Sequence, residues 1–185
     1  LSIDFTANED ITINQPMTHS GSSTVTWDFT GEDITVSNSL SSSSGPINMT
    51  FTNASSTNTT TFDSSSTAVD ILSAGGNITV ATGATEISGG NPLEINSGIN
   101  DDSGTGGAII LTDLTFTNTS DSVSHTISDN GDITLGSIGI TSSGTATFSM
   151  SAAGSIILNG SITSSNALSI DFTANEDITI NQPMT

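Results

Sequence analysis

Residues 1–18 read LSIDFTANEDITINQPMT, and the same eighteen residues return at positions 168–185. The offset between the two copies is 168 − 1 = 167. An identity of this length does not arise by chance, so residues 1–167 form one complete repeat and residues 168–185 begin the next. Repetition on this scale predicts stacked units that bury one another's apolar faces. We therefore expect the chain to be a window from a longer tandem array.

A smaller unit recurs inside the long repeat. It is an isoleucine followed two residues later by an aliphatic residue, as in Asp10-Ile11-Thr12-Ile13. The position numbers of successive motif isoleucines differ by 23, 44, 31, 24, 23 and 22, and these spacings sum to 167. Reading the spacing of 44 as two units of 22 gives seven units per repeat. The motif isoleucines are Ile11, Ile34, Ile78, Ile109, Ile133, Ile156 and Ile178.

Apolar and polar residues alternate around each motif, as at Ile178-Thr179-Ile180. Alternation with a period of two predicts strands that have one buried and one exposed face. Turn-forming Gly, Asn and Pro lie between the alternating segments. Three short strands and three turns in about 23 residues make a triangular coil, and stacked coils pair each strand with its copy in parallel. The predicted fold is an all-β, helix-free parallel β-helix, or β-solenoid, in which the motif isoleucines form one interior column.

Two stretches interrupt this rhythm. Residues 41–66 are rich in Ser and Thr and contain no motif isoleucine, so we expect distorted strands there. Residues 88–107 lie within the spacing of 31, which exceeds a normal unit by about eight. We expect this second stretch to bulge from the solenoid as a loop. Its candidate binding residues are Asn91, Glu94, Asn100, Asp101 and Asp102.

The charge of the chain excludes several classes of function. Nineteen acidic residues and no Lys or Arg give a net charge of −19, so nothing neutralises a nucleic-acid or lipid phosphate. No apolar run approaches the ~20 residues of a membrane span, so we expect no membrane insertion in this segment. The same charge repels anionic polysaccharides, and a catalytic pair has no need to recur in every repeat. We therefore expect no enzymatic activity.

An acidic residue precedes four of the motif isoleucines: Asp10, Asp33, Asp132 and Asp177. Stacked at ~4.8 Å, such carboxylates repel one another by roughly 0.9 kcal/mol in water. Ca²⁺ would relieve this repulsion, and Asp101 and Asp102 add further candidate ligands. The alternative is that each Asp accepts a hydrogen bond from the turn backbone of its own coil. No other cofactor is indicated.

Short units that read G-D-I-T-L, as at residues 131–135, and that are separated by Ser, Thr, Asn and Gly turns resemble filamentous haemagglutinin-type adhesins and autotransporter β-strand repeats. This resemblance implies a right-handed β-helix and an extracellular or cell-surface location. The absence of Lys and Arg departs from most such proteins.

The long repeat favours a structural segment of an extracellular fibre or cell-surface filament. Its expected partners are further copies of the repeat in the same chain, with lateral self-association as an additional contact. The alternative is the stalk of a surface adhesin that binds cells or glycans, with recognition on the loop at 88–107 or outside these residues.

Overall fold

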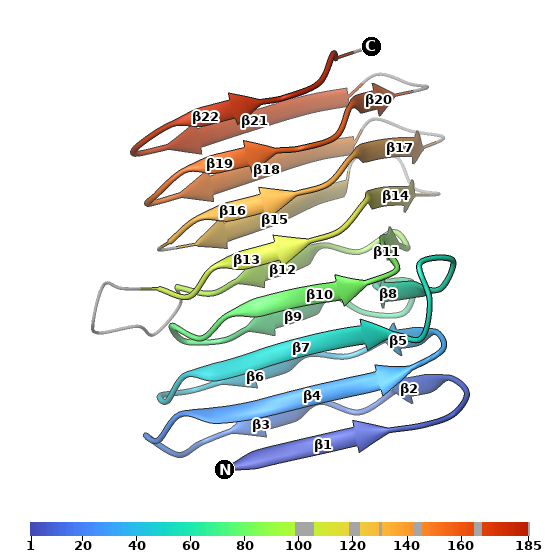
Figure 1. Cartoon of the computed structure of the whole chain (residues 1–185), viewed down its shortest axis with the longest axis vertical. Coiled ribbons are helices and arrows are strands. Elements are labelled where there is room, and N and C mark those ends of the chain that lie inside the picture. Colours follow the sequence, from blue (N-terminus) through green and yellow to red (C-terminus); the bar gives the residue numbers. More distant parts are fainter. Residues whose placement is uncertain (99–105, 119–122, 130, 143–145, 165–167, 185) are drawn as a thin grey trace.

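The computed structural model describes residues 1–98, 106–118, 123–129, 131–142, 146–164 and 168–184. In these residues the chain forms 22 strands and no helix. The strands build three parallel sheets, and the chain visits sheets A, B and C in turn (Figure 1). The predicted β-solenoid is therefore confirmed.

Sheet A consists of β1 (Ser2–Thr6), β4 (Val25–Gly31), β7 (Ile47–Asn53), β10 (Ile78–Thr82), β13 (Ile109–Leu111), β16 (Ile133–Leu135), β19 (Ile156–Leu158) and β22 (Ile178–Ile180). Sheet B consists of β2 (Ile11–Ile13), β5 (Ile34–Val36), β8 (Thr59–Asp63), β11 (Ala84–Ser88), β14 (Leu114–Asn118), β17 (Ile138–Ser142) and β20 (Ile162–Ser164). Sheet C consists of β3 (Met17–His19), β6 (Leu40–Ser42), β9 (Val69–Leu72), β12 (Leu93–Asn96), β15 (Val123–Asp129), β18 (Ala146–Ala152) and β21 (Leu168–Ala174).

The coils climb in one direction from the N-terminus to the C-terminus. In Figure 1 the chain runs from left to right along sheet A at the front, turns behind at the right and returns along sheet C, which makes the coil right-handed. Along sheet A the paired positions advance by 24, 22, 29, 31, 24, 23 and 22 from coil to coil, a total of 175. The residues paired in this way are Ile3, Trp27, Met49, Ile78, Ile109, Ile133, Ile156 and Ile178.

The core is a continuous apolar column inside the three sheets. Strand β7 shows the predicted alternation, since every second residue from Ile47 to Asn53 is buried. On sheet A, Phe29 stacks on Phe5 and on Phe51, with ring centroids 5.0 and 5.1 Å apart. Trp27 beside them is 4 % exposed. Burial of each large side chain stabilises the fold by roughly 1.5–3 kcal/mol, so neighbouring coils hold one another in place.

The stretch at 41–66 is more regular than predicted. Every residue of β7 pairs in unbroken register with β4, so the expectation of distorted strands is wrong for this element. Irregularity lies in the connections 54–58 and 64–68 on either side of β8, and in a register shift between Val80 and Thr82 where β10 pairs with β7. Inside β8 the hydroxyl of Thr60 takes the place of a motif isoleucine and donates a hydrogen bond to Asn53 Oδ1 at 2.8 Å. An inward threonine is thus accommodated because its polar atom has a partner.

The prediction of a single isoleucine column is wrong. Ile11 and Ile34 pair with each other on sheet B, whereas the column of Ile78 continues upward on sheet A. The spacing of 44 between Ile34 and Ile78 holds five strand steps, from β5 to β10, and not the six of two full coils. The long connections around β8 use the residues that would have formed the sixth strand. The threonines that follow the isoleucines are divided between the two sheets in the same way.

The two copies of the eighteen-residue segment therefore occupy different sheets. In the first copy β1, β2 and β3 lie on sheets A, B and C. In the second copy β21 lies on sheet C, β22 lies on sheet A, and Met184 bridges to Ile162 of sheet B. Strands β1 to β20 fill one repeat, and twenty strands on three sheets make 6⅔ coils. The predicted seven coils are close to this value, but the repeat does not close on a whole coil.

Only part of the stretch at 88–107 is an insertion. Ser88 ends β11, and residues 93–96 form β12, so the expectation of a loop is wrong for these residues. The excess lies in the connection 97–108 between β12 and β13, which is much longer than the equivalent connection 153–155 between β18 and β19. Residues 99–105 of this connection lie outside the described residues.

Candidate functional site

The acidic residues predicted to form one column stand in two places. Asp10 and Asp33 precede β2 and β5, at the edge of sheet B where its strands begin. Asp132 and Asp177 precede β16 and β22, at the corresponding edge of sheet A. The proposed ladder of four carboxylates therefore does not exist. Within the described residues, no three Asp, Glu or His side chains gather closely enough to hold a metal ion.

Asp10, Asp33 and Asp132 each join one coil to the next through a side-chain oxygen. Asp10 Oδ1 accepts a hydrogen bond from the backbone N–H of Asp33 at 3.1 Å, and Asp33 Oδ1 accepts one from Thr59 at 2.7 Å. Asp132 Oδ1 does the same for Ser155 at 2.8 Å. The alternative interpretation expected these carboxylates to accept hydrogen bonds from the backbone of their own turn. They do accept from backbone, but the donors lie in the coil above.

Asparagine performs the same task as aspartate in these columns. Asn48 Oδ1 accepts from the N–H of Asn77 at 3.0 Å, and Asn77 Oδ1 accepts from Ala108 at 2.8 Å. An oxygen acceptor at the end of a short side chain therefore serves at this position, and a negative charge is not essential to it. A cation site would need the charge, because Ca²⁺ binds through clustered carboxylates and carbonyls.

Sequence reasoning missed Asp113, Asn48 and, as an acceptor, Asn77. Asp113 Oδ1 accepts the N–H of Ser137 at 2.8 Å. The signal that could have found these residues is an Asp or Asn placed directly before, or one residue after, the first inward residue of a strand. The search for Asp before isoleucine passed over Asp113 because leucine follows it.

Asn91 and Glu94, proposed as ligand-binding residues, take part in the solenoid itself. Asn91 Nδ2 donates to the carbonyl oxygens of Ser64 and Ser65 at 2.7 and 3.2 Å, which ties the corner before β12 to the coil below. Glu94 lies within β12, and its Oε1 accepts a hydrogen bond from Asn96 Nδ2 at 2.9 Å. The other three candidates, Asn100, Asp101 and Asp102, lie outside the described residues.

A line of small polar residues is buried at the corner that leads from sheet C to sheet A. Ser42 and Ser73 donate hydrogen bonds to the carbonyl oxygens of Gly45 and Gly76. One coil further up this corner, Ser97 donates a hydrogen bond to Oδ1 of Asp129. Asp129 is 6 % exposed, and the same Oδ1 also accepts the N–H of Gly131 at 2.9 Å. These bonds satisfy backbone and side-chain groups at a sharp bend, which is a structural role.

Asp63 is the last residue of β8. Hydrogen bonding from the Ser65 side chain lowers the pKa of Asp63, and partial burial opposes this effect. The backbone N–H of Ser65 donates to Asp63 Oδ1 at 2.9 Å, and Ser88 on the coil above donates at 3.4 Å. Hydrogen bonds to the ionised form favour that form. The carboxylate closes a turn and links two coils.

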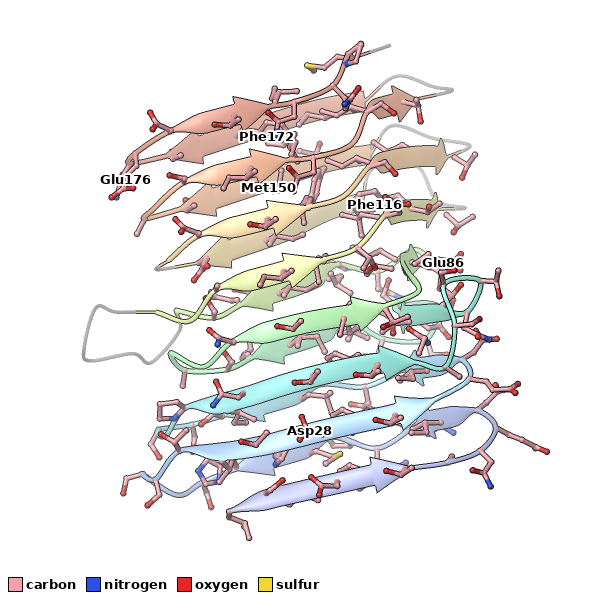
Figure 2. The ribbon with its side chains drawn as sticks, viewed as in Figure 1. Asp28, Glu86, Phe116, Met150, Phe172 and Glu176 are labelled. Carbon is pink, nitrogen blue, oxygen red and sulfur yellow. The ribbon has the colours of Figure 1, made fainter. Side chains whose placement is uncertain are left out.

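Outward-facing acids such as Asp28 on sheet A and Glu86 on sheet B lie on the surface of the stack (Figure 2). Glu86 Oε1 accepts a hydrogen bond from the Thr117 hydroxyl on the coil above. Like the edge aspartates, this acid bonds to the coil above it.

Among the described residues, two solvent-open hollows can be placed. One, of about 530 Å³, runs along the corner between sheets A and B and is lined in part by Ser56, Ile110 and Asp113. The other, of about 410 Å³, lies where inward side chains of the first coil, including Phe5, Ile11 and Met17, face away from the second coil. The second hollow has the apolar lining of the solenoid interior, so a further coil would fill it.

The described part of the chain contains no helix that is long and apolar enough to cross a membrane. Comparisons of the chain with protein-family models, with curated proteins and with solved structures found no match. The resemblance to filamentous haemagglutinins therefore stays a prediction, and the geometry of the coils carries the functional argument.

Proposed function

We propose that this protein is a structural segment of a repetitive extracellular fibre or cell-surface filament. The observation that carries the proposal is that the same eighteen residues pack against the core at both ends of the repeat. Phe5 stacks on Phe29 above it, and its copy Phe172 pairs with Met150 below it (Figure 2). One sequence therefore has an upper and a lower apolar partner, which is what an internal coil of an array requires.

The remaining inward residues of the segment support the same interpretation. Ile11 pairs with Ile34 above, and its copy Ile178 pairs with Ile156 below. Ile178 is 46 % exposed and Met184 is 58 % exposed. If a following coil packed on this segment as the second coil packs on the first, it would cover both side chains. Each added repeat thus buries apolar surface that would otherwise face water.

The proposed location outside the cell agrees with the composition. Without Lys or Arg the chain offers no cleavage site to trypsin-like proteases. The outward positions of the sheets are mainly Ser, Thr, Asn and Asp, which suit a long surface in contact with water. The charge of −19 keeps parallel filaments apart unless counterions screen it.

The test is a chain lengthened to several copies of residues 1–167. We expect unbranched filaments whose length grows by about 32 Å per copy, from 6⅔ coils at ~4.8 Å. Electron microscopy measures the length, and thermal unfolding should move to higher temperature with copy number until it levels off. Independent globules joined by flexible segments would contradict the proposal.

The adhesin alternative rests on the long connection between β12 and β13. A variant in which 130–132, the connection of β15 and β16, replaces residues 97–108 should keep the solenoid, because both connections join sheet C to sheet A. Both chains are then assayed for binding to cells and to glycan arrays. Saturable binding by the parent chain that this variant loses would replace the structural proposal with adhesion.

A further inference from the structure

The long repeat, residues 1–167, does not close on a whole coil, and this determines how successive repeats meet. The second copy of the segment begins on sheet C, whereas the first begins on sheet A. We propose that each repeat of the array is turned by one third of a revolution about the fibre axis relative to the repeat before it. This inference rests on the proposed function, since it concerns the array.

At the junction between two repeats, each side of the solenoid therefore passes from one sheet to another. The side built from sheet C continues as the next repeat's sheet A, because β21 has the sequence of β1. The side built from sheet A continues as sheet B, because β22 has the sequence of β2. The bridge from Met184 to Ile162 starts the same exchange on the third side, where sheet B continues as sheet C.

Each side keeps its apolar column across this exchange. On the first side Met150 lies below Phe172, whose copy Phe5 lies below Phe29. On the second side Ile156 lies below Ile178, and the copy of Ile178 lies below Ile34. On the third side the column runs from Ile162 through Met184 to the equivalent of Leu40. All three columns therefore stay apolar although the sheets have changed places.

The corner chemistry also permits the exchange. The corner from sheet C to sheet A carries closely stacked glycines: a Cβ on Gly107 would lie 2.2 Å from the carbonyl carbon of Gly76. In the eighteen-residue segment, the equivalent residue at this corner is Glu176, and the Glu176 N–H donates to Gly154 O at 3.2 Å. The copy Glu9 stands at the other corner, from sheet A to sheet B, where its carbonyl oxygen accepts from Glu32 at 2.9 Å. One glycine-free sequence thus fits both corners.

The consequence is a fibre without a single distinctive face. A feature that occurs once per repeat, such as the connection 97–108, returns on each of the three sides in turn. It regains its first side after three repeats, which make twenty coils, or about 96 Å along the axis. A second copy of the fibre approaching from any direction therefore meets the same surfaces.

Thiol labelling tests the rotation, because the chain has no cysteine. Thr12 is exposed on β2, and the variant Thr12→Cys in a chain of six repeats carries one gold-cluster label per repeat. We expect the labels on three lines around the filament, about 32 Å apart along the axis, with a slow drift from sheet twist. Labels on one line would overturn the rotation.

The matched control places a second label at Thr163. This residue is exposed on β20, six paired steps above Thr12 on the same sheet. The two labels of one repeat should share a line, ~29 Å apart. Filaments with all labels on one line would refute the rotation but keep the fibre, whereas loss of a continuous filament would refute the proposed function as well.

Discussion

At the scale of single residues, the coils are joined by short acceptor side chains at the sheet edges. Asp132 reaches the N–H of Ser155 on the coil above, and Asn77 reaches that of Ala108 in the same way. Since an amide oxygen and a carboxylate oxygen both serve, the interaction depends on reach and direction. The acidity of the protein has no direct role in these contacts.

The variants Asp132→Asn and Asp132→Ala separate the acceptor from the charge. Asparagine retains the oxygen that Ser155 needs, so we expect a change in the free energy of unfolding within about 0.5 kcal/mol. Alanine removes the acceptor and should destabilise by about 0.5–1.5 kcal/mol. Urea denaturation measures both. Equal destabilisation by the two variants would show that the charge itself matters, as it would for a bound cation.

Asp63 gives the fold a dependence on acid pH. Its pKa is lowered in the folded chain, chiefly by the Ser65 hydroxyl, so its ionised form stabilises the fold above the unfolded pKa of about 4. This contribution is lost as the pH falls through the folded pKa. We expect the difference in melting temperature between the parent chain and Asp63→Asn to shrink as the pH falls below about 4.

The control is Ser65→Ala, which removes the side-chain donor and should weaken the pH dependence without removing the acid. If the difference between the parent chain and Asp63→Asn stays constant over this range, Asp63 does not contribute as described.

At the scale of the elements, the corner glycines decide how closely two coils approach. A Cβ on Gly76 would lie 2.1 Å from the carbonyl oxygen of Ile47, which is backbone and cannot move aside. The same atom on Gly139, within β17, would meet nothing nearer than the Thr115 hydroxyl at 3.8 Å. Close packing of the backbone therefore requires glycine at position 76 but not at position 139.

We expect Gly76→Ala to destabilise the fold by about 1–3 kcal/mol through overpacking. Gly139→Ala should be neutral or stabilise by up to about 1 kcal/mol, because glycine weakens a strand interior. Chemical denaturation of the two variants makes the comparison. If the Gly76→Ala variant were as stable as the parent chain, the backbone at this corner would have to be packed less closely than the structure shows.

The elements also show what the sequence could and could not predict. The alternation of apolar and polar residues predicted the strands and the buried side of each, as in β7 and β16. It could not predict which sheet a strand joins, because all three sheets present the same inward pattern to one core. Ile34 and Ile78 look alike, yet they stand on different sheets.

The sheet assignment depends on connection lengths, which the distance in sequence between Ile34 and Ile78 does not reveal. Glycine two residues before an isoleucine does not reveal the sheet either. Gly76 and Gly131 precede strands of sheet A, but Gly136 and Gly160 precede Ile138 and Ile162 on sheet B. The coil-to-coil hydrogen bonds of the edge residues could not be predicted either, because they require the register of two stacked coils.

At the scale of the whole molecule, nineteen negative charges are spread over a stack of coils. Screening should relieve their mutual repulsion, so we expect the melting temperature to rise with NaCl. Since the edge acceptors bind backbone, a Ca²⁺ chelator should leave the melting temperature unchanged at matched ionic strength. A marked drop with chelator, restored by added Ca²⁺, would contradict this account.

Two identical segments occupy different sheets of one solenoid. Spin labels on exposed cysteines at positions 4, 12 and 179 test it in the chain 1–185, because Asp4 and Thr179 lie seven paired steps apart on sheet A and Thr12 lies on sheet B. Pulsed electron–electron double resonance should give a distance of ~34 Å between labels 4 and 179. It should give a longer distance between labels 12 and 179, which also lie on different sides. The reverse order, with labels 12 and 179 in line at ~34 Å and labels 4 and 179 further apart, would mean that the repeat closes on seven whole coils and that the two segments share their sheets.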